Sequence, residues 1–164
     1  MDASGPGPGS PEPAPRRVLL VGSSGGHLTQ LVALEPWWRD LHRVWVTFAT
    51  MDARTQLVGE EVHWAHHPTT RNIPNLVRNA WLAVRLLRRT RPDVVVSTGA
   101  GVALPFFVVA RLLGIVTAYV EVYDRIDSRT LTGRLCRPFT TVFCVQWEEQ
   151  RNLYRDAHVI GCLL

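Results

Sequence analysis

The 164-residue sequence contains no lysine, because all 18 of its basic residues are arginine. This absence excludes a P-loop, whose lysine is needed to reach the β- and γ-phosphates of a nucleotide. We attribute the arginine bias to the base composition of the source genome. The net charge of +4 is nevertheless compatible with anionic partners such as phosphates or lipid head groups.

Cysteine is also scarce. The three cysteines, Cys136, Cys144 and Cys162, form neither a paired disulfide framework nor a metal-ligand spacing. We therefore expect a reducing, cytosolic environment and no metal site. Residues 1–16 lack the apolar segment of a secretory signal and are rich in proline and glycine, which predicts a disordered tail.

Long hydrophobic runs are missing as well. The longest apolar stretch, residues 101–120, is interrupted by Arg111 and Gly114. A membrane-spanning helix needs ~20 mostly apolar residues, so this stretch is better explained as a buried helix followed by a buried strand. We expect no membrane span.

What the sequence does contain is a regular alternation of short apolar runs and helical patterns, which predicts an α/β domain over residues 17–164. The expected strands are 17–22, 43–50, 61–66, 93–99, 115–121, 140–146 and 157–161, of which 61–66 has the weakest alternation. The expected helices begin at residue 27, cover 73–93 and begin again at 102, and a polar loop precedes residue 140. Repeated strand–helix–strand units predict a doubly wound parallel sheet with helices on both faces.

Three predicted strands end in the segments "GSSGGH", "STGAG" and "VEVYDR". Ligands of such sheets bind beyond the carboxyl ends of the strands, so we expect these segments to share one site. The first segment does not match the dinucleotide fingerprint G-x-G-x-x-G. The second strand also ends in "FAT" rather than in the acidic residue that would bind a ribose.

In the first segment, Gly25 and Gly26 allow the backbone to approach an anion at the start of a helix, although they would equally suit a simple tight turn. His27 follows directly. Its ordinary pKa of ~6.5 suits a general base, and the alternatives are a helix cap or a phosphate ligand.

The other two segments each leave two interpretations open. The glycine-rich turn at residues 97–101 offers either a second anion-binding loop or close packing of a helix on the sheet. Glu121 ends a buried strand, where a carboxylate is costly unless it is paired or solvated. It is a candidate base or sugar-hydroxyl ligand, and an ion pair with Arg125 is an equally simple account.

The helix expected over residues 73–93 is basic and amphipathic, which is typical either of contact with an anionic membrane or of a solvated helix face. The candidate membrane-contact residues are Trp81, Arg85, Arg88 and Arg89. No nucleic-acid partner is expected, because no binding module is present and aromatic residues are not interleaved with the arginines.

Five segments occur in an order and spacing that resemble a known family: "SSGGHLTQL", "DVVVSTGAG", "VEVYDRIDSRTLTGRL", "FCVQWEE" and "VIGCLL". They resemble bacterial polysaccharide-biosynthesis subunits of the PssD/CpsF type. The eukaryotic relative of these subunits is the membrane-anchoring subunit of the two-subunit UDP-N-acetylglucosamine transferase of dolichol-linked oligosaccharide assembly. The sequence is also similar to the N-terminal half of MurG, which carries a GGH loop.

The resemblance implies a Rossmann-like domain that forms the N-terminal, acceptor-side half of a GT-B glycosyltransferase. A separate subunit would bind the UDP-sugar donor, the acceptor would be a polyprenyl-phosphate-linked sugar, and no cofactor would be needed. The protein would lie peripherally on the cytoplasmic face of a membrane. The alternatives are a non-catalytic scaffold that recruits a catalytic partner, and an independent nucleotide-binding enzyme.

The resemblance also implies roles for particular residues. His27 or Glu121 would be the base that deprotonates the acceptor. The family pattern has a serine where this sequence has Val122. The residues implied in acceptor or phosphate binding are Ser23, Ser24, Gly25, Gly26, Thr98, Gly99, Gly101 and Arg125.

Overall fold

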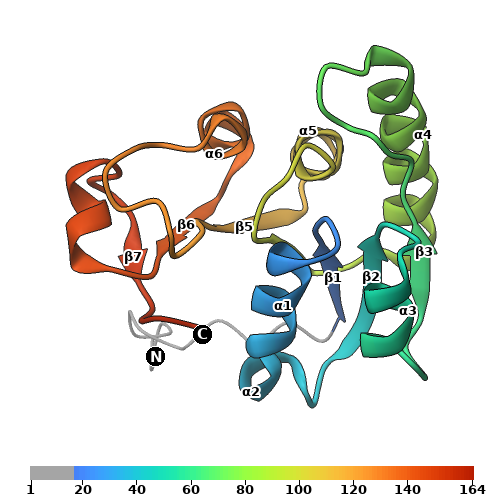
Figure 1. Ribbon diagram of the computed structural model, residues 1–164. Helices are drawn as coiled ribbons and strands as arrows, with labels where there is room; N and C mark the ends of the chain where they lie inside the picture. The colour runs from blue at the N-terminus through green and yellow to red at the C-terminus, as the bar shows by residue number, and fades with distance from the viewer. Residues whose placement is uncertain (1–16) are drawn as a thin grey trace, which may run out of the picture.

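A computed structural model describes residues 17–164, which form a seven-stranded sheet in the order β3-β2-β1-β4-β5-β6-β7 (Figure 1). Every neighbouring pair of strands is parallel, so the predicted α/β class with a Rossmann-like parallel sheet is confirmed. The tail expected over residues 1–16 lies outside the described residues.

Most strands are shorter than the apolar runs that predicted them, because the ends of those runs belong to the adjoining loops. The run at 43–50, for example, is a strand only as far as Thr47. The strands are β1 Arg17–Val21, β2 His42–Thr47, β3 Val62–Trp64, β4 Val94–Ser97, β5 Val116–Val120, β6 Val142–Val145 and β7 His158–Val159.

The longest helix follows the local rules for helix ends. The Asn72 side chain accepts a hydrogen bond from the backbone N–H of Asn75, and the chain leaves the helix at Arg91 in a left-handed conformation, just before Pro92. The helices are α1 Gly26–Ala33, α2 Glu35–Trp38, α3 Met51–Gln56, α4 Ile73–Thr90, α5 Ala103–Leu112 and α6 Leu131–Cys136. Within the described residues, no helix is both long and apolar enough to cross a membrane.

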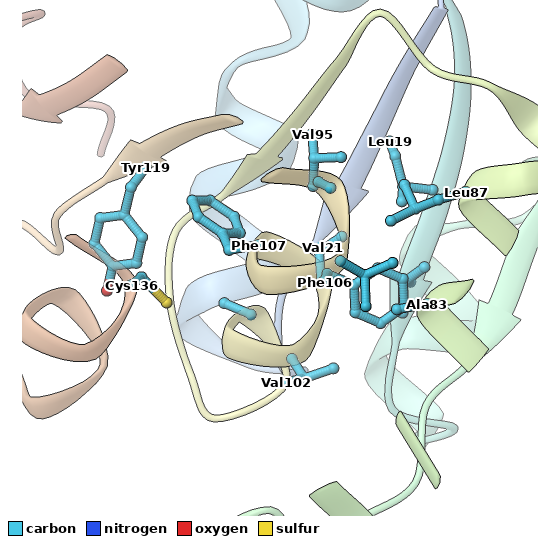
Figure 2. Close-up of a cluster of buried hydrophobic side chains, with 14 of the residues drawn as sticks. Leu19, Val21, Ala83, Leu87, Val95, Val102, Phe106, Phe107, Tyr119 and Cys136 are labelled. Atoms are coloured by element: carbon cyan, nitrogen blue, oxygen red, sulfur yellow. The ribbon is translucent and has the colours of Figure 1, made fainter. Parts of the chain in front are cut away.

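Alternate residues of β1 supply the two halves of the core. Leu19 and Val21 pack with α4 and α5 on one face of the sheet, whereas Val18 and Leu20 pack with α1, α2 and α3 on the other. This is the pattern expected of a strand that is buried on both faces. Figure 2 shows the first of these clusters, in which Phe106 of α5 lies close to Leu87 and Ala83 of α4.

Two helices were not predicted. The segment after β5, expected to be a polar loop, contains the six-residue helix α6, and α3 follows β2. Neither is long enough to show a hydrophobic period. Thr130 begins α6 by accepting a hydrogen bond from the backbone N–H of Gly133, and this same threonine also contacts the site.

Candidate functional site

A cavity of about 400 Å³ lies at the carboxyl end of the sheet, beside the loops that follow β1, β4 and β5. All three segments singled out in the sequence therefore contribute to one site, as expected for this type of sheet. The cavity is lined by Gly26, His27, Gln30, Ala100, Tyr119, Val122, Tyr123, Asp124, Arg125, Thr130 and Thr132.

His27 is fixed by two hydrogen bonds to a single residue of the β4–α5 loop. Its Nδ1 lies 2.8 Å from the carbonyl oxygen of Thr98, and the Thr98 hydroxyl donates to the carbonyl oxygen of His27, also at 2.8 Å. A carbonyl oxygen can only accept, so Nδ1 carries the hydrogen and the neutral imidazole has its lone pair on Nε2. Within the described residues Nε2 has no hydrogen-bond partner, and it is therefore available to accept a proton.

The imidazole ring lies directly against Gly99. A Cβ atom at this position would come within 2.9 Å of Cε1 of His27 and within 2.9 Å of the Tyr119 hydroxyl oxygen. The φ angle of Gly99 is +120°, a conformation that residues with side chains rarely adopt. The absence of a side chain at Gly99 therefore makes room for the imidazole of His27, a role that differs from both interpretations offered by the sequence.

Burial of the imidazole lowers the pKa of His27 below its ordinary value of 6.5. The hydrogen bond to Thr98 and the carboxylates of Asp124 and Glu121 raise the pKa again, but they do not cancel the effect of burial. The imidazole is thus neutral at pH 7, which is the protonation state that a general base requires.

This lowered pKa predicts a loss of stability in mild acid. The unfolded chain binds a proton at His27 more readily than the folded chain does, so the stability is fully present above pH 6.5 and falls as the pH decreases toward the lowered pKa. One proton contributes at most about 1.4 kcal/mol per pH unit. We expect the decrease in Tm between pH 7.5 and pH 5.5 to be smaller in His27→Gln than in the wild type, and equal decreases would contradict the assignment.

Glu121 lies beneath the cavity rather than in its lining. Its side chain is fully buried, and its carboxylate accepts hydrogen bonds from the hydroxyls of Thr130 and Tyr154 and from the backbone N–H of Val122. Among the described residues it forms no ion pair, so the simple account of a Glu121–Arg125 bridge is wrong. The geometry favours a structural role for this carboxylate, which holds the β5–α6 loop in place.

The candidate phosphate-binding residues have diverse environments. The backbone N–H of Gly25 donates to a carboxylate oxygen of Asp52 at 3.0 Å, whereas Gly26 lines the cavity. Gly101 packs against Thr69, where a Cβ would approach Oγ1 to 2.9 Å. The remaining candidates differ in exposure: Thr98 is buried, Ser23 and Ser24 are half-buried, and Arg125 is exposed.

The sequence analysis did not identify several residues that line the cavity. For two of them, Gln30 and Tyr119, the sequence contained a signal. Gln30 lies one helical turn after His27 and therefore on the same face of α1. Tyr119 of β5 precedes Glu121, the first residue after this strand, by two positions, so the alternation of a strand places both side chains on the same face of the sheet. Asp124 and Thr130 belong to the β5–α6 loop, whose path no local pattern predicts.

A buried chain of amides connects this site to the end of the sheet. The Gln146 side-chain nitrogen donates to Gln30 Oε1 at 2.6 Å and to the carbonyl oxygen of Glu121 at 2.9 Å. Its side-chain oxygen accepts from the backbone N–H of Leu163 at 2.9 Å. Gln146 is therefore hydrogen-bonded at once to α1, to the residue that follows β5 and to the C-terminal segment.

The four candidate membrane-contact residues lie together on the outer side of α4, and none of them lines the cavity that contains His27. Trp81 is 75% exposed, and the arginine side chains follow it along the same helix. Together with residues that include His66 and Arg78, they line an open groove of about 710 Å³. Within the described part of the chain, no group of three or more histidine, cysteine or acidic side chains could hold a metal ion.

The comparison with protein families matches residues 60–163 to the family described as "Oligosaccharide biosynthesis protein Alg14 like". The chain belongs to this family. It is 28% identical to the UDP-N-acetylglucosamine transferase subunit ALG14 of Mus musculus, over 88% of this chain and 82% of the mouse protein.

The Alg14-like chain is also homologous to the N-terminal half of the MurG transferases. It is 33% identical to the UDP-N-acetylglucosamine–N-acetylmuramyl-(pentapeptide) pyrophosphoryl-undecaprenol N-acetylglucosamine transferase of Syntrophotalea carbinolica, over 55% of this chain but only 25% of that enzyme.

Solved structures agree on the fold. The MurG structure from Acinetobacter baumannii superimposes with a TM-score of 0.67 at 20% identity, and the match covers 81% of this chain. The UDP-GlcNAc 2-epimerase from Neisseria meningitidis gives a TM-score of 0.71 at 13% identity and covers 88% of this chain. The chain spans only 42% and 46% of those two structures.

Proposed function

We propose that this chain is the acceptor-side subunit of a two-component, UDP-sugar-dependent glycosyltransferase in polysaccharide biosynthesis, of the PssD/CpsF type. Residues 17–164 would form the acceptor-binding domain, and the acceptor would be a sugar linked to a polyprenyl phosphate. The observation that carries this proposal is His27, whose neutral imidazole is fixed through Nδ1 in a cavity at the carboxyl end of the sheet.

In the proposed reaction, Nε2 of His27 takes the proton from a hydroxyl group of the acceptor. The resulting oxygen nucleophile attacks the anomeric carbon of the UDP-sugar, the new glycosidic bond forms, and the bond to UDP breaks with inversion. Of the two candidate bases, His27 is favoured because Glu121 is fully buried and already accepts three different hydrogen-bond donors.

The loops around His27 would hold the phosphate of the acceptor. Gly26 and Arg125 line the cavity, and they offer a backbone N–H at the start of α1 and an exposed guanidinium group. Ser23 and Ser24 precede Gly26 in the β1–α1 loop. Thr98 and Gly99 would act indirectly, because they orient and accommodate the imidazole of His27.

A partner subunit would bind the donor. The relative in Mus musculus is named a transferase subunit and is covered over 82% of its length, whereas this chain covers only 25% of the MurG-type transferase of Syntrophotalea carbinolica. The part of the single-chain enzyme that this chain does not cover would correspond to a separate nucleotide-sugar-binding polypeptide.

Reconstitution of the two subunits tests the proposal. We expect the co-purified complex to transfer labelled sugar from a UDP-sugar to membrane-extracted lipid acceptor, and we expect each subunit alone to be inactive. Full activity of the partner alone would contradict an acceptor-side role. Saturable binding of UDP by this chain alone in a calorimetric titration would instead favour an independent nucleotide-binding enzyme.

We further propose that α4 places the protein on the cytoplasmic surface of a membrane. Ile73, Val77 and Trp81 are 73%, 62% and 75% exposed and recur every four residues, so they form one apolar row on the helix. Arg85, Arg88 and Arg89 continue toward the C-terminal end of α4 and would meet anionic head groups.

Removing part of this row weakens the membrane contact. Burying a large apolar side chain contributes about 1.5–3 kcal/mol, so Trp81→Ser is expected to lower the partition coefficient onto anionic vesicles by about tenfold or more. Co-sedimentation with vesicles measures the effect. Leu112→Ser is the matched control, because Leu112 is 80% exposed but lies on α5. Equal losses in both variants would contradict the assignment of α4.

A further inference from the structure

A second hollow, of about 530 Å³, lies next to the cavity that contains His27 and shares no lining residue with it. It is formed by α6, by the 3-10 turn Arg137–Phe139 and by the 3-10 turn Glu148–Asn152 with the residues that follow it (Figure 1, orange to red). We call it the arginine hollow, because its lining includes Arg129, Arg134, Arg137 and Arg155.

The arginine hollow carries more positive charge than the protein neutralises. Asp156 is the one carboxylate in its lining, and it pairs with Arg137 at 3.2 Å although its side chain is 89% exposed. Among residues 17–164, the other three lining arginines form no ion pair with any carboxylate. Like charges gathered in one concave surface repel one another, and a bound anion relieves this repulsion.

Two of the guanidinium groups are held in place by aromatic rings. Arg129 lies 5.4 Å and Arg137 lies 6.0 Å from the centre of the Tyr154 ring, and Arg137 also lies 4.8 Å from the centre of the Phe143 ring. The Tyr154 ring is itself fixed, because it stacks on Phe143 and its hydroxyl donates to Glu121. Guanidinium groups that are ordered before binding lose less entropy on binding an anion.

We propose that the arginine hollow is a binding site for a diphosphate group. Guanidinium groups match phosphate oxygens with paired N–H donors, and a diphosphate concentrates several negative charges in a volume that such a hollow accepts. The diphosphate is either the head group of a lipid or part of a soluble molecule. This site is separate from the proposed catalytic cavity, because the two share no lining residue, but it lies beside that cavity, since Arg129 lines one and its neighbour Thr130 lines the other.

Titration with inorganic pyrophosphate tests the site without any transferase assay. The test variant is Arg134→Gln/Arg155→Gln, and both side chains are exposed, so the fold is preserved. The control variant is Arg71→Gln/Arg111→Gln, which removes the same charge from exposed positions outside the hollow. We expect about tenfold weaker pyrophosphate binding in the test variant and less than about a twofold change in the control.

Vesicles containing diacylglycerol pyrophosphate, compared with phosphatidylcholine alone, distinguish the two sources of the diphosphate. Weaker vesicle binding in the test variant than in the control supports a lipid head group. Hollow-dependent binding of free pyrophosphate with unchanged vesicle binding supports a soluble ligand. Equal effects of the two variants on both probes, or no binding of either probe by the wild type, would overturn the proposal.

Discussion

Replacement of His27 by alanine is expected to lower the rate of sugar transfer by about 10²–10⁴-fold, the range associated with the loss of a general base. The neutral imidazole has its lone pair on Nε2 because Nδ1 donates to the Thr98 carbonyl, and the ring lies in the lining of the cavity. The measurement is transfer of labelled sugar to the lipid acceptor by the co-purified complex. Co-purification shows in the same experiment that the partner still binds.

Two further variants serve as comparisons for His27→Ala. His63→Ala removes a histidine that lies on β3 and bonds to Glu61 away from the cavity, so transfer should remain within about twofold of the wild type. Glu121→Gln keeps the size of the buried side chain, and we expect it to lower Tm more than His27→Ala does. If His27→Ala assembles and turns over normally, the chain is a scaffold for a catalytic partner.

Replacement of Gly99 by alanine is expected to destabilise the fold by about 2–6 kcal/mol and to reduce transfer as well. The added methyl group would lie 2.9 Å from the His27 ring and 2.9 Å from the Tyr119 hydroxyl oxygen, and the backbone has a φ of +120°. Backbone strain contributes about 1–3 kcal/mol and overpacking a similar amount. Chemical denaturation measures the stability, and the transfer assay measures the displacement of the imidazole.

Gly59 provides the matched control for this substitution. Its φ is +84°, but a Cβ there would meet no atom within 4 Å, so Gly59→Ala has the strain without the clash. We expect a smaller destabilisation and unchanged transfer. The double variant Gly99→Ala/Tyr119→Phe removes one of the two close contacts and should recover part of the lost stability. Equal destabilisation by Gly59→Ala and Gly99→Ala would show that packing against His27 is not the cause.

The fold was largely predictable because it depends on local signals. The buried runs at β1 and β4 end in glycine-rich loops, and α4 has an asparagine cap and a proline after its last turn. The helix α6 was not predictable in this way. It has six residues, exposes Leu131 and Leu135, and begins at a threonine whose hydroxyl donates to Glu121, nine residues earlier in the sequence. Such a contact leaves no local pattern.

The location of the candidate site in the sheet could be predicted from the sequence, but the hydrogen-bond partners of its residues could not. The rule that ligands lie beyond the carboxyl ends of parallel strands brought His27 and the β5–α6 loop together correctly. The same reasoning could not show that Glu121 points away from solvent or that Asp52 occupies the N–H of Gly25. These outcomes depend on which groups a folded chain places within 3 Å of one another, and residues 25 and 52 share no sequence signal.

The amide contact between Gln30 and Gln146 affects how the protein is made. These residues are 116 positions apart, so at the usual synthesis rates of about 5–20 residues per second Gln146 is added about 6–23 s after Gln30. During that interval β1, β2 and β3 can pair on a ribosome, but the polar side of α1 has no buried partner. For several seconds the nascent chain therefore exposes the side of α1 that carries Gln30, which is long enough for a chaperone to bind.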